Sequence, residues 1–313
     1  MQLRDISQPA RGAYVALEDL IALRFPARQL KITRRSRALS ALAGPNKSNF
    51  RGRGIDFEEV RNYQPGDDIR TIDWRVTART GKAHTKLFRE ERERPALIVV
   101  DQRASMFFGS SHCFKSVLAA QLGSLFAWSA LDNGERVGGL VFNDAAHREV
   151  RPRRSRRNVL ALLSEIDQYN HALPPSQPGS DSTFDDMLAN LRRIARPGTS
   201  LFLVSDFHGA DSDAAREHLF QLAQHTQITA VSCSDPLEFS LPRAGRYAVT
   251  DGSARSELNT ADRSLQREYQ VAMTLRQDEL KRDLLRLGIP LLNASTSEAP
   301  FALLQNFYGE QRR

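Results

Sequence analysis

The sequence of 313 residues lacks several features that mark particular classes of protein. No segment approaches the roughly 20 consecutive apolar residues that span a bilayer, and residues 1–14 lack the apolar centre of a secretory signal. These absences predict a cytoplasmic protein. The two cysteines, Cys113 and Cys233, lie far apart and without CxxC spacing, so we expect free, buried thiols rather than a zinc site or a redox pair.

Nucleotide-binding motifs are also missing. The chain has no glycine-rich loop of the form GxxxxGK[ST], which cradles phosphates in ATPases. Gly52 and Gly54 lack the preceding strand and the third glycine of a dinucleotide-binding motif. The seven histidines include no i, i+4 pair around a glutamate, the zinc-binding pattern of metalloproteases. We therefore expect neither a nucleotide site nor a zinc centre.

Basic residues are concentrated in the first third of the chain. Residues 1–94 contain 20 Lys and Arg against 12 Asp and Glu, whereas the remainder contains 24 against 25. A basic region can bind nucleic acid, anionic lipid or an acidic protein surface, and charge alone does not choose among these. Interspersed acidic residues argue against a dedicated nucleic-acid-binding arm. The arginine-rich turn 151–157 is typical of a solvated surface, and its alternative use is an acidic docking site.

Hydrophobic periodicity divides the chain into three parts. Apolar residues at helical spacing predict a short helix over 13–25 that ends at Pro26. A basic stretch and a turn-rich segment then place a boundary near residue 50. We predict an N-terminal helical and basic arm over 1–50 and a segment over 51–94 that packs on the core. In the third part, 95–313, short apolar runs alternate with amphipathic segments, as in βαβ units.

This third part predicts an α/β fold with a mainly parallel central sheet and helices on both faces. Expected strands are 96–100, 137–142, 201–204, 228–231 and 290–293, with 147–150 as an antiparallel edge strand. Expected helices are 115–131, 158–166, 184–194, 214–225 and 261–287. The turn signal Asp251-Gly252-Ser253 predicts an accessory hairpin near 246–259.

Polar residues that follow the predicted strands form the candidate site. Ligands of an open parallel sheet bind at the carboxyl ends of its strands. Asp101 and Ser105 follow the first core strand, and Asp206 follows the strand that ends at Val204. Each aspartate alone is equally explained as a helix cap. With the loop residue Thr183, however, these carboxylate and hydroxyl oxygens are the ligands that Mg²⁺ or Mn²⁺ prefers.

This layout resembles a von Willebrand factor A domain, whose metal-ion-dependent adhesion site has the pattern Asp-x-Ser-x-Ser, then Thr, then Asp. Asp101, Ser105, Thr183 and Asp206 match in order, and the resemblance implies a von Willebrand factor A-like fold. Arg103 stands where the first serine is expected. A guanidinium has no acceptor and cannot ligate a cation, so it could instead take the metal's place and pair with Asp101 or Asp206. The sequence thus predicts a degenerate site, with no certain cofactor and Mg²⁺ or Mn²⁺ as the candidates.

A longer motif lies upstream of the predicted sheet. It contains Gly52-x-Gly54, Arg61-x-Tyr63, Pro65-Gly66-Asp67, Arg70-x-Ile72-Asp73-Trp74 and Ala78-Arg79, followed by Glu90-Glu91. These elements, in this order, resemble the signature of the bacterial domain of unknown function 58 family, and with the A-like core the resemblance covers roughly residues 30–240. It implies a cytoplasmic or membrane-linked partner of MoxR-type AAA ATPases and no known catalytic activity.

The side chains of this signature have both structural and functional interpretations. Phe57, Tyr63 and Trp74 can pack onto the sheet, and ion pairs can form at its margin among Arg61, Arg70, Asp67 and Asp73. We favour this bracing role for the aromatic residues and for Asp73. Arg53, Arg75 and Arg79 are equally explained by bracing or by binding a partner, because arginine is enriched at protein interfaces.

The leading hypothesis is a non-catalytic protein-interaction adaptor. Its partner would be a MoxR-type AAA ATPase that acts in the assembly, maturation or remodelling of an unknown client protein. One alternative is a divalent-metal-dependent hydrolase or nuclease that uses Asp101 and Asp206, but such chemistry needs more than two carboxylates and Arg103 removes a ligand. Another is a non-catalytic nucleic-acid-binding protein that uses residues 31–53, and its affinity would fall steeply with salt.

Overall fold

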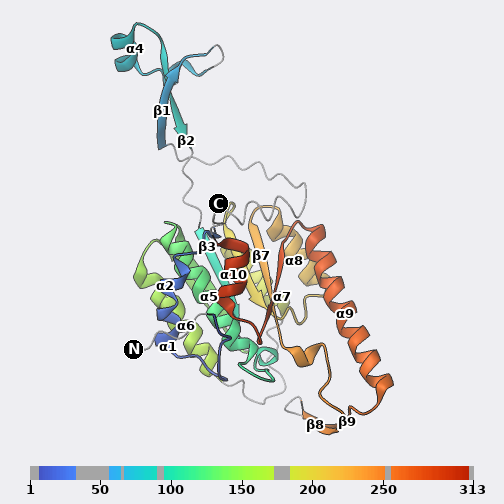
Figure 1. Cartoon of the computed structure of the whole chain (residues 1–313). Coiled ribbons are helices and arrows are strands. Elements are labelled where there is room, and N and C mark those ends of the chain that lie inside the picture. Colours follow the sequence, from blue (N-terminus) through green and yellow to red (C-terminus); the bar gives the residue numbers. More distant parts are fainter. Residues whose placement is uncertain are drawn as a thin grey trace. The chain divides into compact units, whose positions relative to one another are not determined.

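The computed structural model describes residues 7–32, 56–64, 67–89, 95–172, 184–250 and 255–309. The chain folds as two compact units (Figure 1). Residues 1–48 together with 94–313 form the larger unit, and residues 49–93 form the smaller unit.

The larger unit is built on a six-stranded sheet with the order β10-β7-β6-β3-β4-β5. Its strands are β3 (Pro95–Asp101), β4 (Arg136–Phe142), β5 (His147–Arg153), β6 (Ser200–Ser205), β7 (Gln227–Ser234) and β10 (Leu291–Ser295). Neighbouring strands are parallel except β4 and β5, which are antiparallel. The predicted α/β class, the mainly parallel sheet and the antiparallel edge strand are confirmed.

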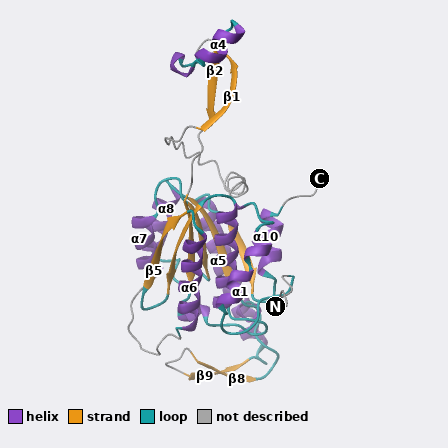
Figure 2. Cartoon of the chain, turned by 90° about the vertical axis from the view of Figure 1, so that its left-hand side faces the viewer, coloured by secondary structure: helices purple, strands orange, loops and turns teal. Residues whose placement is uncertain are grey.

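Helices cover both faces of this sheet (Figure 2). Successive residues of a strand point to opposite faces, so Ile98 and Val100 of β3 belong to one core, whereas Leu97 and Val99 belong to the other. The first core includes α5 (Lys115–Asp132), α6 (Arg156–His171) and α10 (Pro300–Tyr308). The second includes α7 (Phe184–Ile194), α8 (Asp213–Ala223) and the C-terminal part of α9 (Arg263–Arg286). Strands buried on both faces are continuous apolar runs, which is why the sequence predicts them well.

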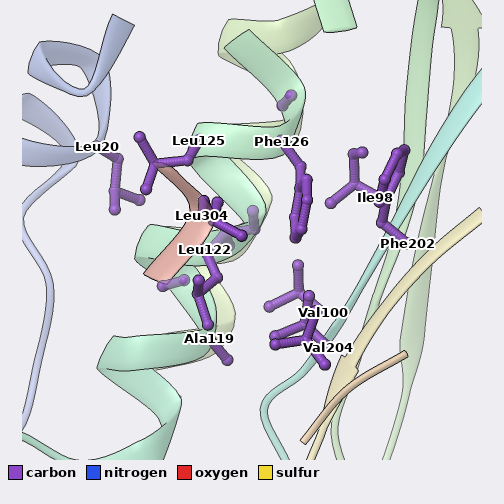
Figure 3. Packing of buried hydrophobic residues seen from close by; sticks show 14 of the residues in the cluster. Leu20, Ile98, Val100, Ala119, Leu122, Leu125, Phe126, Phe202, Val204 and Leu304 are labelled. Carbon is purple, nitrogen blue, oxygen red and sulfur yellow. The ribbon is translucent and has the colours of Figure 1, made fainter. Parts of the chain in front are cut away.

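Helix α5 lies directly on the sheet. Its Phe126 stacks on Phe202 of β6 with ring centroids 4.5 Å apart, and Figure 3 shows Phe126 directed toward Ile98 and Phe202. Gly123 permits this close approach, because a Cβ atom there would lie 2.6 Å from a methyl carbon of Val100. The first residue of this helix, Lys115, reaches the carboxyl edge of the strands, where it contacts Asp206.

Residues 7–32 belong to the core of the larger unit rather than to the separate arm predicted over 1–50. They form two short helices, α1 (Leu17–Ala22) and α2 (Arg24–Ala27). Leu20 is fully buried, and Trp128 of α5 donates its indole N–H to the Leu20 carbonyl at 3.1 Å. Pro26 lies inside α2 and does not end a helix as expected. The first turn of a helix tolerates proline, because the backbone N–H there has no partner within the helix.

The smaller unit contains an antiparallel strand pair, β1 (Asp56–Asn62) and β2 (His84–Arg89), with the 3-10 helix η1 (Ile69–Thr71) and helix α4 (Trp74–Thr80) between them in the chain. Asp73 caps α4, since its Oδ1 accepts the backbone N–H groups of Arg75 and Val76 at 3.0 and 3.1 Å. Arg61 and Asp67 form one of the expected ion pairs, at 2.8 Å. The packing of this unit, and of Phe57, Tyr63 and Trp74, on the sheet stays a prediction.

Two further expectations are confirmed in the larger unit. Strands β8 (Arg246–Thr250) and β9 (Arg255–Asn259) pair antiparallel as the accessory hairpin. Cys113 and Cys233 are free and buried, and burial raises the pKa of the Cys113 thiol to about 12. Among the helices that the structure describes, none combines the length and the apolar character needed to cross a membrane.

Candidate functional site

The ends of β3 and β6 bring two aspartates together. The two strands are parallel neighbours with Val100 beside Val204, so Asp101 at the end of β3 and Asp206 just after β6 lie at the same edge of the sheet. The side chain of Asp101 is fully buried, and that of Asp206 is 8% exposed. Both carboxylates are therefore largely removed from water and need partners of opposite charge.

Arg103 contacts both aspartates. Its Nη2 donates to Asp101 Oδ2 at 2.7 Å, and its Nε lies 3.1 Å from each carboxylate oxygen of Asp101. The same Nη2 lies 3.5 Å from Asp206 Oδ1. The guanidinium carbon stands 5.5 Å from the ring centroid of Phe142 and 5.1 Å from that of Phe184, so two aromatic rings also stabilise the cation. Arg103 is thus fixed in place by charge and by packing.

Lys115 is a second buried cation at this edge. Its Nζ donates to Asp206 Oδ2 at 3.0 Å and to Glu238 Oε1 at 2.6 Å. Glu238 ends the short helix η3 (Pro236–Glu238), where it forms a reciprocal capping box with Asp235. Neither Lys115 nor Glu238 is predicted from the sequence. The available signal is a lysine at the start of an apolar helix, a position where the helix dipole disfavours a cation.

The charge state of this cluster follows from burial and from its ion pairs. Burial raises the pKa of the Asp101 carboxyl, and Arg103 opposes that effect. Burial also acts to raise the pKa of Asp206, but Lys115 and Arg103 help to hold it below its usual value. Burial acts to lower the pKa of Lys115, whereas Asp206 and Glu238 raise it above its ordinary value. The cluster is a set of buried charges that neutralise one another.

The predicted metal ligands are brought together only in part. Asp101 and Asp206 meet at Arg103, and Ser205, which the sequence does not single out, donates its hydroxyl to Asp101 Oδ2 at 2.6 Å. Ser105 lies in the short helix η2 (Ala104–Met106), and its buried hydroxyl has no hydrogen-bond partner in the part of the chain that the structure describes. Thr183 lies outside the described residues.

As the structure describes them, Asp101 and Asp206 are not free to hold a divalent cation. Within the described ranges, no three His, Cys, Asp or Glu side chains form a group that could hold a metal ion. Asp101 and Asp206 are already bonded to a guanidinium and an ammonium group. A Mg²⁺ or Mn²⁺ ion placed at these carboxylates would be repelled by both cations. The site is closed by the protein's own side chains.

Phe207, the residue after Asp206, has a strained backbone. Its φ of 57° is in the left-handed region, where a bulky residue is a genuine outlier. Its backbone N–H donates to Ser205 Oγ at 2.9 Å, and its ring meets Phe184 edge-on with centroids 6.0 Å apart. Such strain costs on the order of 1–3 kcal/mol and clusters at functional sites. The conformation therefore draws attention to the loop that follows β6.

A cavity of about 670 Å³ opens beside the charged cluster. Its walls come from the loop after β3, from the segments after β6 and β7, and from α9. Its apolar side chains include Phe107, Phe108, Phe207, Phe239, Met273 and Leu280. Its polar lining includes Lys115, Asp206 and Glu238, which are paired with one another. Further charged residues, among them Arg216, Arg276 and Glu279, also line it. The cavity therefore offers a ligand both apolar and charged contacts.

The predicted partner-binding arginines belong to the smaller unit. Arg75 and Arg79 lie on α4 and are exposed. Their four-residue spacing puts them on the same face of the helix. Trp74, which precedes Arg75, is 68% exposed. Arg53 lies outside the described residues.

Known proteins resemble this chain along most of its length. The profile of a family described as "Protein of unknown function DUF58" matches residues 59–279. Uncharacterized protein Rv1480 of Mycobacterium tuberculosis is 28% identical over 287 residues, which cover 91% of this chain and 89% of that protein. Uncharacterized protein YeaD of Bacillus subtilis is 34% identical over 79 residues, which cover 25% of this chain and 18% of that protein.

Two solved structures are also similar to parts of the chain. The conserved hypothetical protein BatB from Bacteroides thetaiotaomicron has a TM-score of 0.41 and 13% identity, over 68% of this chain and 96% of that chain. A von Willebrand factor type A protein from Catenulispora acidiphila has a TM-score of 0.33 and 13% identity, over 48% of this chain and 35% of that chain.

Proposed function

We propose a function from one premise: the chain belongs to the family described as "Protein of unknown function DUF58". It acts as a non-catalytic protein-interaction adaptor, and its partner is a MoxR-type AAA ATPase that assembles, matures or remodels a client protein. The family resemblance of the signature segment supports the ATPase as the partner. The closed ion-pair cluster at the carboxyl edge of the sheet supports the absence of catalysis.

A hydrolase or nuclease at this edge would need a carboxylate that is free to hold a metal ion or to accept a proton. Asp101 instead accepts hydrogen bonds from Arg103 and Ser205, and Asp206 accepts from Lys115. A general base must also reach the proton that it removes, and Asp101 is fully buried. The geometry thus favours the adaptor over the metal-dependent enzyme.

We propose the cavity as the docking place on the larger unit. Aromatic residues are enriched at protein interfaces, and Phe108, in its wall, is 41% exposed. An apolar side chain of the partner would contact it there. On the smaller unit, Arg53, Arg75 and Arg79 are the proposed contacts for an acidic face of the partner.

The test is binding of the full chain to a MoxR-type AAA ATPase from the same organism, with and without nucleotide. We expect saturable binding, and in the absence of nucleotide EDTA should not change it, because Arg103 and Lys115 already pair with the two aspartates. Phe108→Ala should weaken binding by about tenfold if its ring is a buried anchor. Arg75→Ala with Arg79→Ala should mainly slow association and reduce its salt dependence.

Two control variants separate docking from folding. Phe220 on α8 is 47% exposed and is not part of the cavity lining, so Phe220→Ala should bind as wild type. Asp73→Ala removes the cap of α4 and should lower stability by about 1 kcal/mol. Hydrolysis of ATP or nucleic acid that disappears in Asp101→Ala would overturn the non-catalytic assignment, and a lack of saturable ATPase binding would overturn the adaptor.

A further inference from the structure

A second surface, on the outer strand of the sheet, carries a concentration of positive charge. Strand β5 pairs with β4 on one side and has no strand on its other side among the described residues. Residues 136–157 contain seven arginines, two acidic residues and no lysine. We define the arginine edge as Arg151 and Arg153 of β5 together with Arg156 and Arg157 at the start of α6.

The four guanidinium groups of the arginine edge have no carboxylate partner in the part of the chain that the structure describes, and all four residues are exposed. The neighbouring Arg148, in contrast, has Nε 3.8 Å from Glu165 Oε2. Unpaired, solvated charges of one sign create a positive potential that attracts an acidic partner. The arginine edge is therefore available for intermolecular contacts.

Stability of the fold does not explain these residues. Arg156 and Arg157 are the first two residues of α6, whose first turn contains no acidic residue. The dipole of a helix disfavours cations at its N-terminus. Charged residues on an edge strand do prevent unwanted strand pairing, and Arg151 and Arg153 can serve in this way. That role does not require two more cations at the start of the adjoining helix.

We propose that the arginine edge binds an acidic segment of another protein. The planar fork of arginine donates two hydrogen bonds to one carboxylate, which the ammonium of lysine does not do. Single-stranded nucleic acid is usually bound with the help of aromatic side chains on which bases stack. None of the exposed large hydrophobic side chains of the described residues lies between 136 and 171. This surface therefore lacks the stacking groups for nucleic acid and the apolar groups for membrane insertion.

This inference rests on the proposed adaptor function and deepens it. An adaptor holds two proteins, so it needs two separate surfaces. The cavity adjoins the ends of β6 and β7, whereas the arginine edge lies beyond β3 and β4 at the other side of the sheet. An ATPase and an acidic client segment could thus be bound together.

The test measures binding of the full chain to a fluorescein-labelled decaglutamate peptide by anisotropy at two salt concentrations. Wild type should bind, and the affinity should fall with salt. Changing all four arginines of the arginine edge to glutamine should weaken binding by at least about tenfold. Changing all four to lysine keeps the charge but loses the fork, so this variant should lie between wild type and the glutamine variant.

The matched control changes four other exposed arginines to glutamine, namely Arg246, Arg263, Arg267 and Arg282. It has the same net charge as the first glutamine variant and should bind the peptide as wild type does. An equal loss in both variants, or no peptide binding by wild type, would overturn the proposal. So would tighter binding of oligo-dT or of phosphatidylglycerol vesicles through the same four arginines.

Binding of the AAA ATPase to the same variants distinguishes this proposal from the adaptor function. If the ATPase binds and the peptide does not, the proposed role of the arginine edge is wrong and the adaptor function is still supported. If the peptide binds through the four arginines and the ATPase does not bind, the arginine edge stands and the ATPase partnership fails. Melting temperatures no lower than that of wild type would show that a variant has lost binding without losing its fold.

Discussion

The larger unit has arginines in two different places, at the carboxyl ends of the strands and on the outer strand β5, and their surroundings differ. Arg103, at the carboxyl edge, is 5% exposed and bonded to Asp101. Arg151 and Arg153, on the outer strand, are exposed and have no carboxylate partner among the described residues. A buried charge destabilises a protein by several kcal/mol unless it is paired, whereas a solvated charge changes stability little. Arg103 is therefore needed for the stability of the fold, whereas Arg151 and Arg153 are free to bind a partner.

The largest expected effect is a loss of stability when the buried Arg103 is replaced. Arg103→Met should lower the free energy of unfolding by about 3–5 kcal/mol, because it leaves Asp101 buried without its cation. Arg153→Met, on the outer strand, should change it by less than about 0.5 kcal/mol. Urea denaturation of both variants measures the difference.

A double variant separates lost charge pairing from lost packing. Adding Asp101→Asn to Arg103→Met removes the unpaired charge, so it should recover part of the lost stability. If Arg103→Met alone is no less stable than Arg153→Met, the buried Arg103–Asp101 pair contributes no more to stability than an exposed arginine does, which contradicts the prediction.

A smaller effect is expected from pH, again on the buried cluster. Because Lys115 and Arg103 help to hold the pKa of Asp206 below its usual value, the ionised carboxylate stabilises the folded state above the unfolded pKa near 4. That contribution is lost as pH falls through the lowered folded pKa. The free energy of unfolding of wild type should exceed that of Asp206→Asn at pH 7, and the difference between the two proteins should narrow below about pH 4. A gap that stays constant down to pH 2 would show that folding does not lower the pKa of Asp206.

The smallest expected effect is on the exposed side. Arg156→Glu and Arg157→Glu should each raise the free energy of unfolding by about 0.3–1 kcal/mol, because an anion at the start of α6 complements the helix dipole. The same changes should weaken binding of the acidic peptide, so stability and binding should move in opposite directions. Arg151→Glu, away from the helix start, should weaken binding without the gain in stability. A loss of stability in the two helix variants would mean that these arginines do support the fold.

Short runs of apolar residues predict most of the sheet, because strands that are buried on both faces are continuous apolar runs. Helix α9 is also close to its expected bounds, 263–286 against 261–287. The N-terminal segment is less predictable. Its apolar residues look like one amphipathic helix, yet they form two, and Pro26 lies within the second. Trp128, which donates a hydrogen bond to the Leu20 carbonyl, is more than a hundred positions away.

The sequence by itself determines that Asp101 and Asp206 share an edge, because the strands that precede them are parallel and their carboxyl ends lie at one edge of the sheet. It also determines that Arg103 cannot be a metal ligand, since a guanidinium has no acceptor atom. Only the tertiary structure decides that Lys115 and Glu238, which are 123 positions apart, join the same cluster. The attraction between Lys115 and Glu238 depends on the distance between their charges and on the exclusion of water. The short distance and the exclusion of water arise only when α5 packs on the sheet and η3 lies at its edge.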